Sequence, residues 1–159
     1  MVHLLIALAG TLALVAPARA DEPLPGVYDQ VEIAPTKTSI YIGSVSMTMP
    51  PFAHRPGGYA STYVAKVFPY FFYNERGRLE IDVSDDQLRQ LAQGETIHFQ
   101  GRGVNEDGEE RHVEGRAVPA DALSGHIKVR VFVTKKIQLI FNTTYRFAGP
   151  HPATEPQTD

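Results

Sequence analysis

Apolar and polar residues alternate with a period of two through most of the chain between residues 39 and 147. Such alternation is typical of β-strands that bury one face. Strands are expected over 39–49, 59–73 and 79–83, and two further hairpins over 97–117 and 127–147. In the first of these strands the apolar positions change parity across Gly43, which we interpret as a β-bulge. The short links between segments predict antiparallel pairing.

The segment 97–117 fixes the register of its own hairpin. Ile97 and Phe99 on one strand and Val113 on the other are expected to face the core, and directly paired residues share a face. This condition selects a three-residue turn over 106–108, with glycine in the left-handed position. The predicted pairs are His98 with Arg116, Gln100 with Glu114, and Arg102 with His112.

One helix is expected after Ser84. Ser84 is a favourable N-cap residue, and Gln87 three positions later completes a capping box. Leu88 and Leu91 form a narrow apolar stripe, and Gly94 is expected to end the helix.

The segments together predict an all-β, mainly antiparallel fold of about seven strands with one short capped helix. A β-sandwich is favoured, because the parity change at Gly43 and the position of Pro69 inside a strand suggest the corners of folded sheets. A small closed barrel is the alternative.

The N-terminus has the layout of a cleavable signal peptide. The apolar run over 4–15 is shorter than the roughly 20 residues that span a bilayer, and Ala18 and Ala20 form a small-residue cleavage site before Asp21. We therefore expect export to the periplasm or the extracellular space, with no membrane span after cleavage. The expected organisation is a signal peptide over 1–20, an extended lead-in over 21–38 with a short strand near 31–33, a single β domain over 39–147, and a disordered proline-rich tail over 148–159.

Composition excludes several classes of function. The chain has no cysteine, which excludes disulfides and thiolate metal sites. Its 15 Lys and Arg against 18 Asp and Glu give a net charge of −3. A mildly acidic chain without a basic cluster argues against nucleic acid and against anionic membranes as partners. No cofactor is expected, since no phosphate loop, His-Glu-x-x-His motif or nucleophile elbow is present.

Three histidines, His98, His112 and His126, occur in successive predicted strands, and three histidines can bind zinc. The predicted pairing sets Arg116 beside His98 and Arg102 beside His112, and a neighbouring cation disfavours metal binding. We therefore interpret the histidines as part of a charged surface and expect no metal site.

The stretch 68–73 contains five aromatic rings in six residues. The favoured interpretation is a core strand buried on both faces, with the helix covering the second face. The functional hypothesis is that part of this second face lines a cavity or an exposed patch that binds an apolar or amphipathic molecule. The candidate ligand-binding residues are Tyr63, Phe68, Tyr70 and Phe72, with His54 and Arg55 of the expected loop over 50–58 placed at the mouth.

The sequence carries no catalytic signature, so we expect a non-catalytic binding or accessory domain. A first alternative is a structural component of a cell-envelope assembly, which would pack an aromatic or edge strand on an envelope protein. A hydrolase using Glu80, Asp82 or a histidine is the least favoured alternative, because alternation places acidic residues on the solvent face of most strands.

Overall fold

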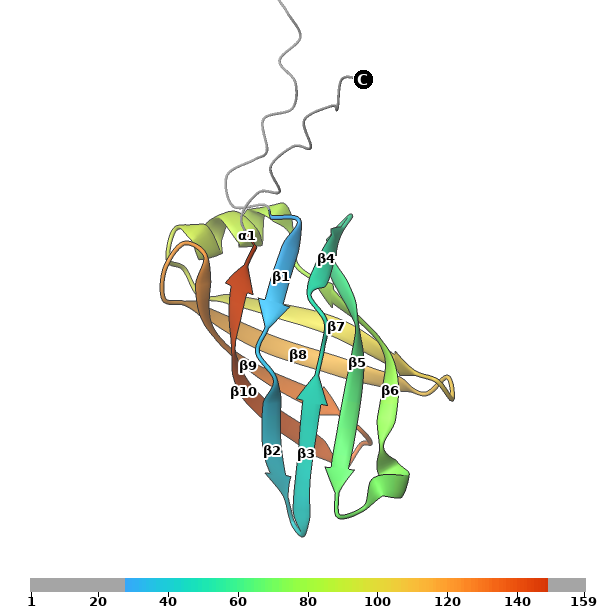
Figure 1. Cartoon of the computed structure of the whole chain (residues 1–159). Coiled ribbons are helices and arrows are strands. Elements are labelled where there is room, and N and C mark those ends of the chain that lie inside the picture. The colour runs from blue at the N-terminus through green and yellow to red at the C-terminus, as the bar shows by residue number, and fades with distance from the viewer. Residues whose placement is uncertain (1–27, 149–159) are drawn as a thin grey trace, which may run out of the picture.

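The computed structural model describes residues 28–148, which form ten strands, one α-helix and one short 3-10 helix (Figure 1). In chain order these elements are β1 (Gln30–Ile33), β2 (Thr36–Ile40), β3 (Gly43–Thr48), β4 (Phe52–Arg55), β5 (Gly58–Phe68), η1 (Phe71–Tyr73), β6 (Glu75–Asp82), α1 (Asp85–Ala92), β7 (Ile97–Asn105), β8 (Glu110–Pro119), β9 (Ser124–Phe132) and β10 (Gln138–Phe147).

Eight strands of the described chain close a barrel by antiparallel pairing in the order β1, β4, β5, β6, β7, β8, β9 and β10. The ring closes where β10 pairs with β1, with Val31 opposite Phe147. The hairpin of β2 and β3 lengthens one wall, because β3 pairs with the second half of β5. On its other side, Thr36 of β2 donates a hydrogen bond to the carbonyl of Asn142 in β10 at 3.1 Å. The all-β, antiparallel prediction is confirmed, and the structure shows the closed barrel rather than the favoured sandwich.

One rule describes the inner face from β5 to β10, where odd-numbered side chains point into the barrel. Every ladder in this part of the chain pairs odd residues with odd residues, for example Leu79 with Gly103 and Val113 with Val131. The large buried apolar and tyrosine side chains that follow the rule are Tyr59, Tyr63, Leu79, Ile97, Val113, Ile127, Val131, Phe141, Tyr145 and Phe147. Because strand side chains alternate between faces, keeping one parity through every connection forms a single enclosed core.

The parity change at Gly43 is a chain reversal and not the predicted β-bulge. Ile40 pairs with Gly43, so Tyr41 and Ile42 form a two-residue turn between β2 and β3. Gly43 has a φ of 122°, and a Cβ at this position would lie 1.9 Å from the carbonyl oxygen of Phe68. A turn of this kind therefore requires glycine.

Three other boundaries differ from the prediction in the first half of the chain. The expected loop over 50–58 contains β4, whose Phe52 is buried, and the expected lead-in contributes most of β2. The short strand expected near 31–33 within that lead-in is confirmed as β1. The strand expected over 59–73 ends at Phe68, before Pro69, which has no N–H for a ladder. The chain then continues through η1 and starts β6 at Glu75.

The predictions for the second half of the chain are confirmed in detail. The three predicted pairs between β7 and β8 are observed, and Gly108 in the three-residue turn has a φ of 80°. Ser84 and Gln87 form the predicted capping box, and Gly94, with a φ of 89°, follows the helix. The last hairpin, β9 and β10, reverses around Lys135, within the expected Lys135-Lys136 turn.

The two ends of the barrel are built differently (Figure 1). Helix α1 lies across one end and buries Leu88 and Leu91, whose side chains are 2% and 4% exposed. The other end carries η1 and the turns between β2 and β3, β7 and β8, and β9 and β10. Among residues 28–148 the structure has no helix of the length and apolar character needed to cross a membrane. The predicted signal peptide and residues 149–159 of the predicted tail lie outside the described residues.

Candidate ligand cavity and its mouth

The barrel encloses a cavity of about 740 Å³. Ligand cavities for small molecules span roughly 300–1,000 Å³, and an eight-stranded barrel is wide enough to hold one small ligand. Small residues at inward positions help to leave this space, among them Ala65 and Gly103. Gly115 contributes indirectly. A Cβ at position 115 would lie 2.0 Å from Cζ of Phe99, so the glycine leaves room for the Phe99 ring.

The cavity is closed and apolar at the helix end. Leu88 and Leu91 of α1 line this end together with buried side chains of the surrounding strands, such as Ile97 and Phe147. Leu88 is among the largest fully buried side chains of the described residues. The helix therefore acts as an apolar plug, held in place by its capping box and by its contacts with β7 and β8.

The cavity opens at the opposite end. There its lining includes Phe72, Tyr73 and Ile137, whose side chains are 76%, 66% and 53% exposed to solvent. Deeper inward residues such as Met47 and Leu139 line the cavity and are half-buried. Their remaining exposed surface faces the cavity, so a small molecule would enter beside η1.

Polar lining residues are concentrated at this open end. Tyr63 donates a hydrogen bond to Oε1 of Glu75 at 2.5 Å, and Arg111 Nη2 binds Oε2 of Glu75 at 2.8 Å. The same guanidinium nitrogen binds Glu109 at 2.6 Å, and the side-chain amide of Asn105 donates to both carboxylates. We call these five residues the mouth cluster.

The titration of the mouth cluster follows from this geometry. Burial, and then the hydrogen bond to the Glu75 carboxylate, raise the pKa of Tyr63 well above its usual range. The hydrogen bonds from Arg111 and Asn105 lower the pKa of Glu109. Partial burial lowers the pKa of Arg111, but its ion pairs with Glu109 and Glu75 outweigh this effect and raise it. Counted by formal charge, Glu75 and Glu109 against Arg111 give the cluster a net charge of −1.

The structure brings only some of the predicted ligand-binding residues together. Tyr63 and Phe72 line the cavity, whereas Phe68, which is exposed, and Tyr70, which is half-buried, do not. His54 and Arg55 lie at the helix end and not at the mouth. Arg55 Nη2 binds Asp82 at 2.7 Å, and His54 approaches Asp85 of α1 at 4.0 Å.

The aromatic stretch itself is not the buried core strand that its pattern favoured. Phe68 and Phe71 to Tyr73 are 61–76% exposed, because the strand ends at Pro69 and η1 turns the following rings outward. Rings of this stretch contact one another, with centroids of Phe72 and Tyr73 at 4.5 Å and of Phe68 and Phe71 at 5.9 Å.

Sequence reasoning missed Glu75, Asn105 and Arg111, although the pattern holds a signal for them. Each occupies an odd-numbered, inward position on a strand whose other odd-numbered side chains are apolar or glycine. A polar residue at an inward position, repeated at the same end of three neighbouring strands, marks a polar site inside a barrel.

The carboxylates and histidines of the other hypotheses lie outside the barrel. Glu80 and Asp82 are even-numbered, outward residues of β6 and lie 3.9 and 2.7 Å from Arg55. His98, His112 and His126 are also even-numbered and outward on β7, β8 and β9. Within the part of the chain that the structure describes, no three His, Cys, Asp or Glu side chains converge on a metal position.

No protein-family model, curated protein or solved structure matches this chain. The class of protein is therefore defined by the structure alone. It is a closed antiparallel β-barrel of eight strand positions with an internal apolar cavity, plugged at one end by a helix and open at the other.

Proposed function

We propose that this chain is an exported binding protein that holds one apolar or amphipathic small molecule inside its barrel. The observation that carries the proposal is the cavity of about 740 Å³, which is largely apolar beneath α1 and has its charged lining residues at its mouth. Apolar lining with a few convergent polar groups is the usual composition of a small-molecule site. The signal-type N-terminus supports export.

The distribution of lining residues suggests how the ligand lies. Its apolar part extends toward Leu88 and Leu91 beneath the helix plug, where burial is energetically most favourable. Its polar part meets the mouth cluster beside Glu75 and Arg111. Because that cluster carries a net negative charge, it favours a neutral or cationic polar group over a carboxylate.

The test compares two identical substitutions on opposite faces of the barrel wall. Val129 points into the cavity and is half-buried, whereas Val64 points outward and is exposed. Val129→Phe fills part of the cavity, and Val64→Phe adds the same ring outside it. With N-phenyl-naphthylamine as a neutral fluorescent probe, we expect Val129→Phe to weaken binding at least tenfold, about 1.4 kcal/mol, and Val64→Phe to leave it unchanged.

Equal probe affinity in the two variants, each shown by circular dichroism to be folded, would contradict the proposal. Native mass spectrometry of the protein from its producing cell then identifies the natural occupant. We expect a bound mass that is lost on denaturation and is absent from Val129→Phe.

A further inference from the structure

Six of the exposed hydrophobic side chains at the open end of the barrel lie on the β2–β3 turn, the end of β5 and η1. They are Tyr41, Ile42, Phe68, Phe71, Phe72 and Tyr73, with exposed fractions from 59% to 102%, and we call them the aromatic rim. The rim is continuous, because Ser44, next to the β2–β3 turn, pairs with Phe68 at the end of β5. Single exposed apolar residues are ordinary, but a contiguous patch marks a site of interaction with another protein or a membrane.

The chain segment that carries the aromatic rim has only positive formal charges. No Asp or Glu occurs between residues 33 and 74, a segment that holds the whole rim. Within it, Lys37 on β2 and Lys66 on β5 are exposed on the two strands that lead to the rim. The net charge of −3 for the whole chain conceals this separation of charges, so the expectation that anionic membranes are excluded does not apply to this surface.

We infer that the aromatic rim docks on a phospholipid surface that contains anionic lipids, with the mouth of the cavity facing the lipid. Tyrosine and phenylalanine suit the membrane–water interface, where the ring is buried among apolar groups and a tyrosine hydroxyl stays hydrated. Lys37 and Lys66 provide the attraction to anionic headgroups. Phe72 and Tyr73 belong both to the rim and to the cavity lining, so docking would bring the mouth to the lipid.

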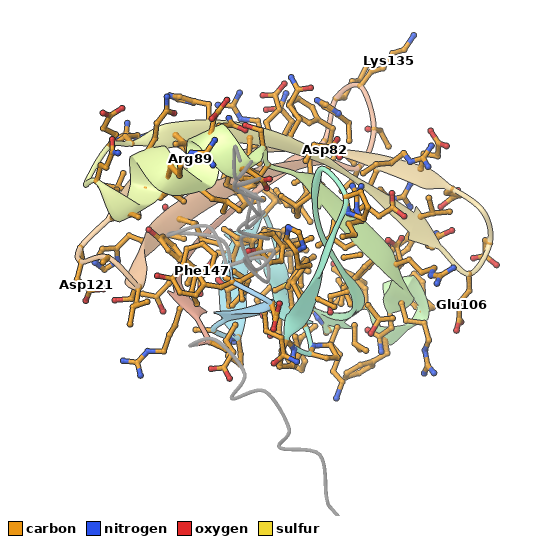
Figure 2. The ribbon with its side chains drawn as sticks, turned by 90° about the horizontal axis from the view of Figure 1, so that it is seen from above. Asp82, Arg89, Glu106, Asp121, Lys135 and Phe147 are labelled. Carbon is orange, nitrogen blue, oxygen red and sulfur yellow. The ribbon has the colours of Figure 1, made fainter. Side chains whose placement is uncertain are left out.

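The acidic part of the open end stands to one side of the rim. Glu106 and Asp107 lie in the β7–β8 turn, which Figure 1 shows beside the barrel and nearer to α1 than the β2–β3 turn and η1. Figure 2 shows Glu106 at the periphery of the molecule. Repulsion of these two acids by anionic headgroups tilts the barrel so that the β2–β3 turn and η1 approach the lipid first.

The absence of tryptophan from the chain allows a direct test. Phe72→Trp places one tryptophan in the aromatic rim, and Leu123→Trp places one on an exposed apolar position of the β8–β9 loop at the helix end. The probes are vesicles of phosphatidylcholine and phosphatidylglycerol in equal parts, and vesicles of phosphatidylcholine alone. We expect the mixed vesicles to shift the emission of Phe72→Trp to shorter wavelength and to leave that of Leu123→Trp unchanged.

The lysines are tested in the Phe72→Trp background. Changing both Lys37 and Lys66 to Glu should weaken binding to the mixed vesicles by about tenfold or more. An equal shift with phosphatidylcholine alone would support docking and overturn the role of the lysines. No shift with either vesicle, or an equal shift for Leu123→Trp, would overturn the proposal. A third outcome is that vesicles have no effect and the mass of the protein in solution rises with protein concentration. In that case the rim binds protein, and the lipid proposal is also overturned.

The docking proposal and the proposed ligand-binding function fail separately. Val129→Phe should lose the naphthylamine probe and keep vesicle binding. The double lysine variant should lose vesicle binding and keep the probe. If either variant loses both probe binding and vesicle binding, the cavity and the rim are not independent sites. That result would overturn the assignment of ligand binding to the cavity and lipid docking to the rim.

Discussion

The two ends of the barrel use similar residues for opposite purposes. At the helix end, Leu88, Leu91 and Phe147 are buried, and polar groups pair across the surface, as Arg55 does with Asp82. At the open end, six large apolar side chains face solvent and only the mouth cluster is densely hydrogen-bonded. Apolar area contributes to folding only when folding removes it from water. The helix end therefore stabilises the fold, and the aromatic rim contributes its apolar area to interactions with other molecules.

The largest expected contrast between the ends is in stability. Leu88→Ala removes a side chain that is 2% exposed and leaves space beneath the helix plug. We expect it to lower the free energy of unfolding by about 2–5 kcal/mol. Phe72→Ala removes a larger side chain that is 76% exposed, and should change the same quantity by less than about 0.5 kcal/mol. Urea denaturation of both variants measures the difference.

A similar cost for both substitutions would mean that the rim packs against the fold in solution, and the proposed division between the ends would be wrong. The helix plug also closes the cavity, so Leu88→Ala should weaken binding of the naphthylamine probe even under conditions where the variant remains folded.

At the open end, the mouth cluster is the part that we expect to stabilise the fold. Removing its cation, the Arg111 guanidinium, tests this expectation. Arg111→Met keeps an unbranched apolar side chain and leaves Glu75 and Glu109 without their shared cation. We expect a loss of about 2 kcal/mol, since the Glu75 carboxylate is largely buried. Arg76→Met is the matched control, because Arg76 is 68% exposed and its ion pair with Glu106 spans 3.8 Å.

Arg76→Met should change stability by less than about 0.5 kcal/mol. Both variants are compared by urea denaturation at neutral pH and moderate salt. If the two arginines prove equivalent, the mouth cluster is a surface feature, and the cavity has no structured polar end.

The sequence predicts the second half of the barrel better than the first half, for a physical reason. Between 97 and 117, alternation and one glycine turn are sufficient to fix three residue pairs, because each constraint is local. The capping box of Ser84 and Gln87 is equally local. In the first half, the Tyr41-Ile42 turn has none of the usual turn residues, and only the glycine after it marks the reversal.

Barrel closure and the exposure of the rings could not be predicted in this way. Closure depends on the pairing of β1 with β10, across more than a hundred residues, and no local pattern specifies it. Phe68 and Phe72 look like core residues because apolar rings are usually buried. Their exposure follows from the end of β5 at Pro69, whereas Tyr59 and Tyr63 of the same strand point inward and are buried as expected.

The last contrast between the ends is the smallest, and it concerns tyrosine titration in alkali. Burial raises the pKa of Tyr145, at the helix end, from 10.0 to about 12. Because the neutral form is favoured in the folded state, this stabilisation is fully present below pH 10 and is lost as the pH rises from 10 toward 12. Within that window the free energy of unfolding falls by about 1.4 kcal/mol per pH unit for this residue.

Tyr145→Phe removes this titration, so its unfolding free energy should fall less steeply between pH 10 and 12 than that of the unchanged protein. Tyr41→Phe, in the fully exposed β2–β3 turn, is the matched control and should keep the original slope. Urea denaturation at several pH values measures both slopes. Equal slopes in the two variants would mean that the Tyr145 hydroxyl is hydrated in the folded protein, and that the helix end is more open to water than its packing indicates.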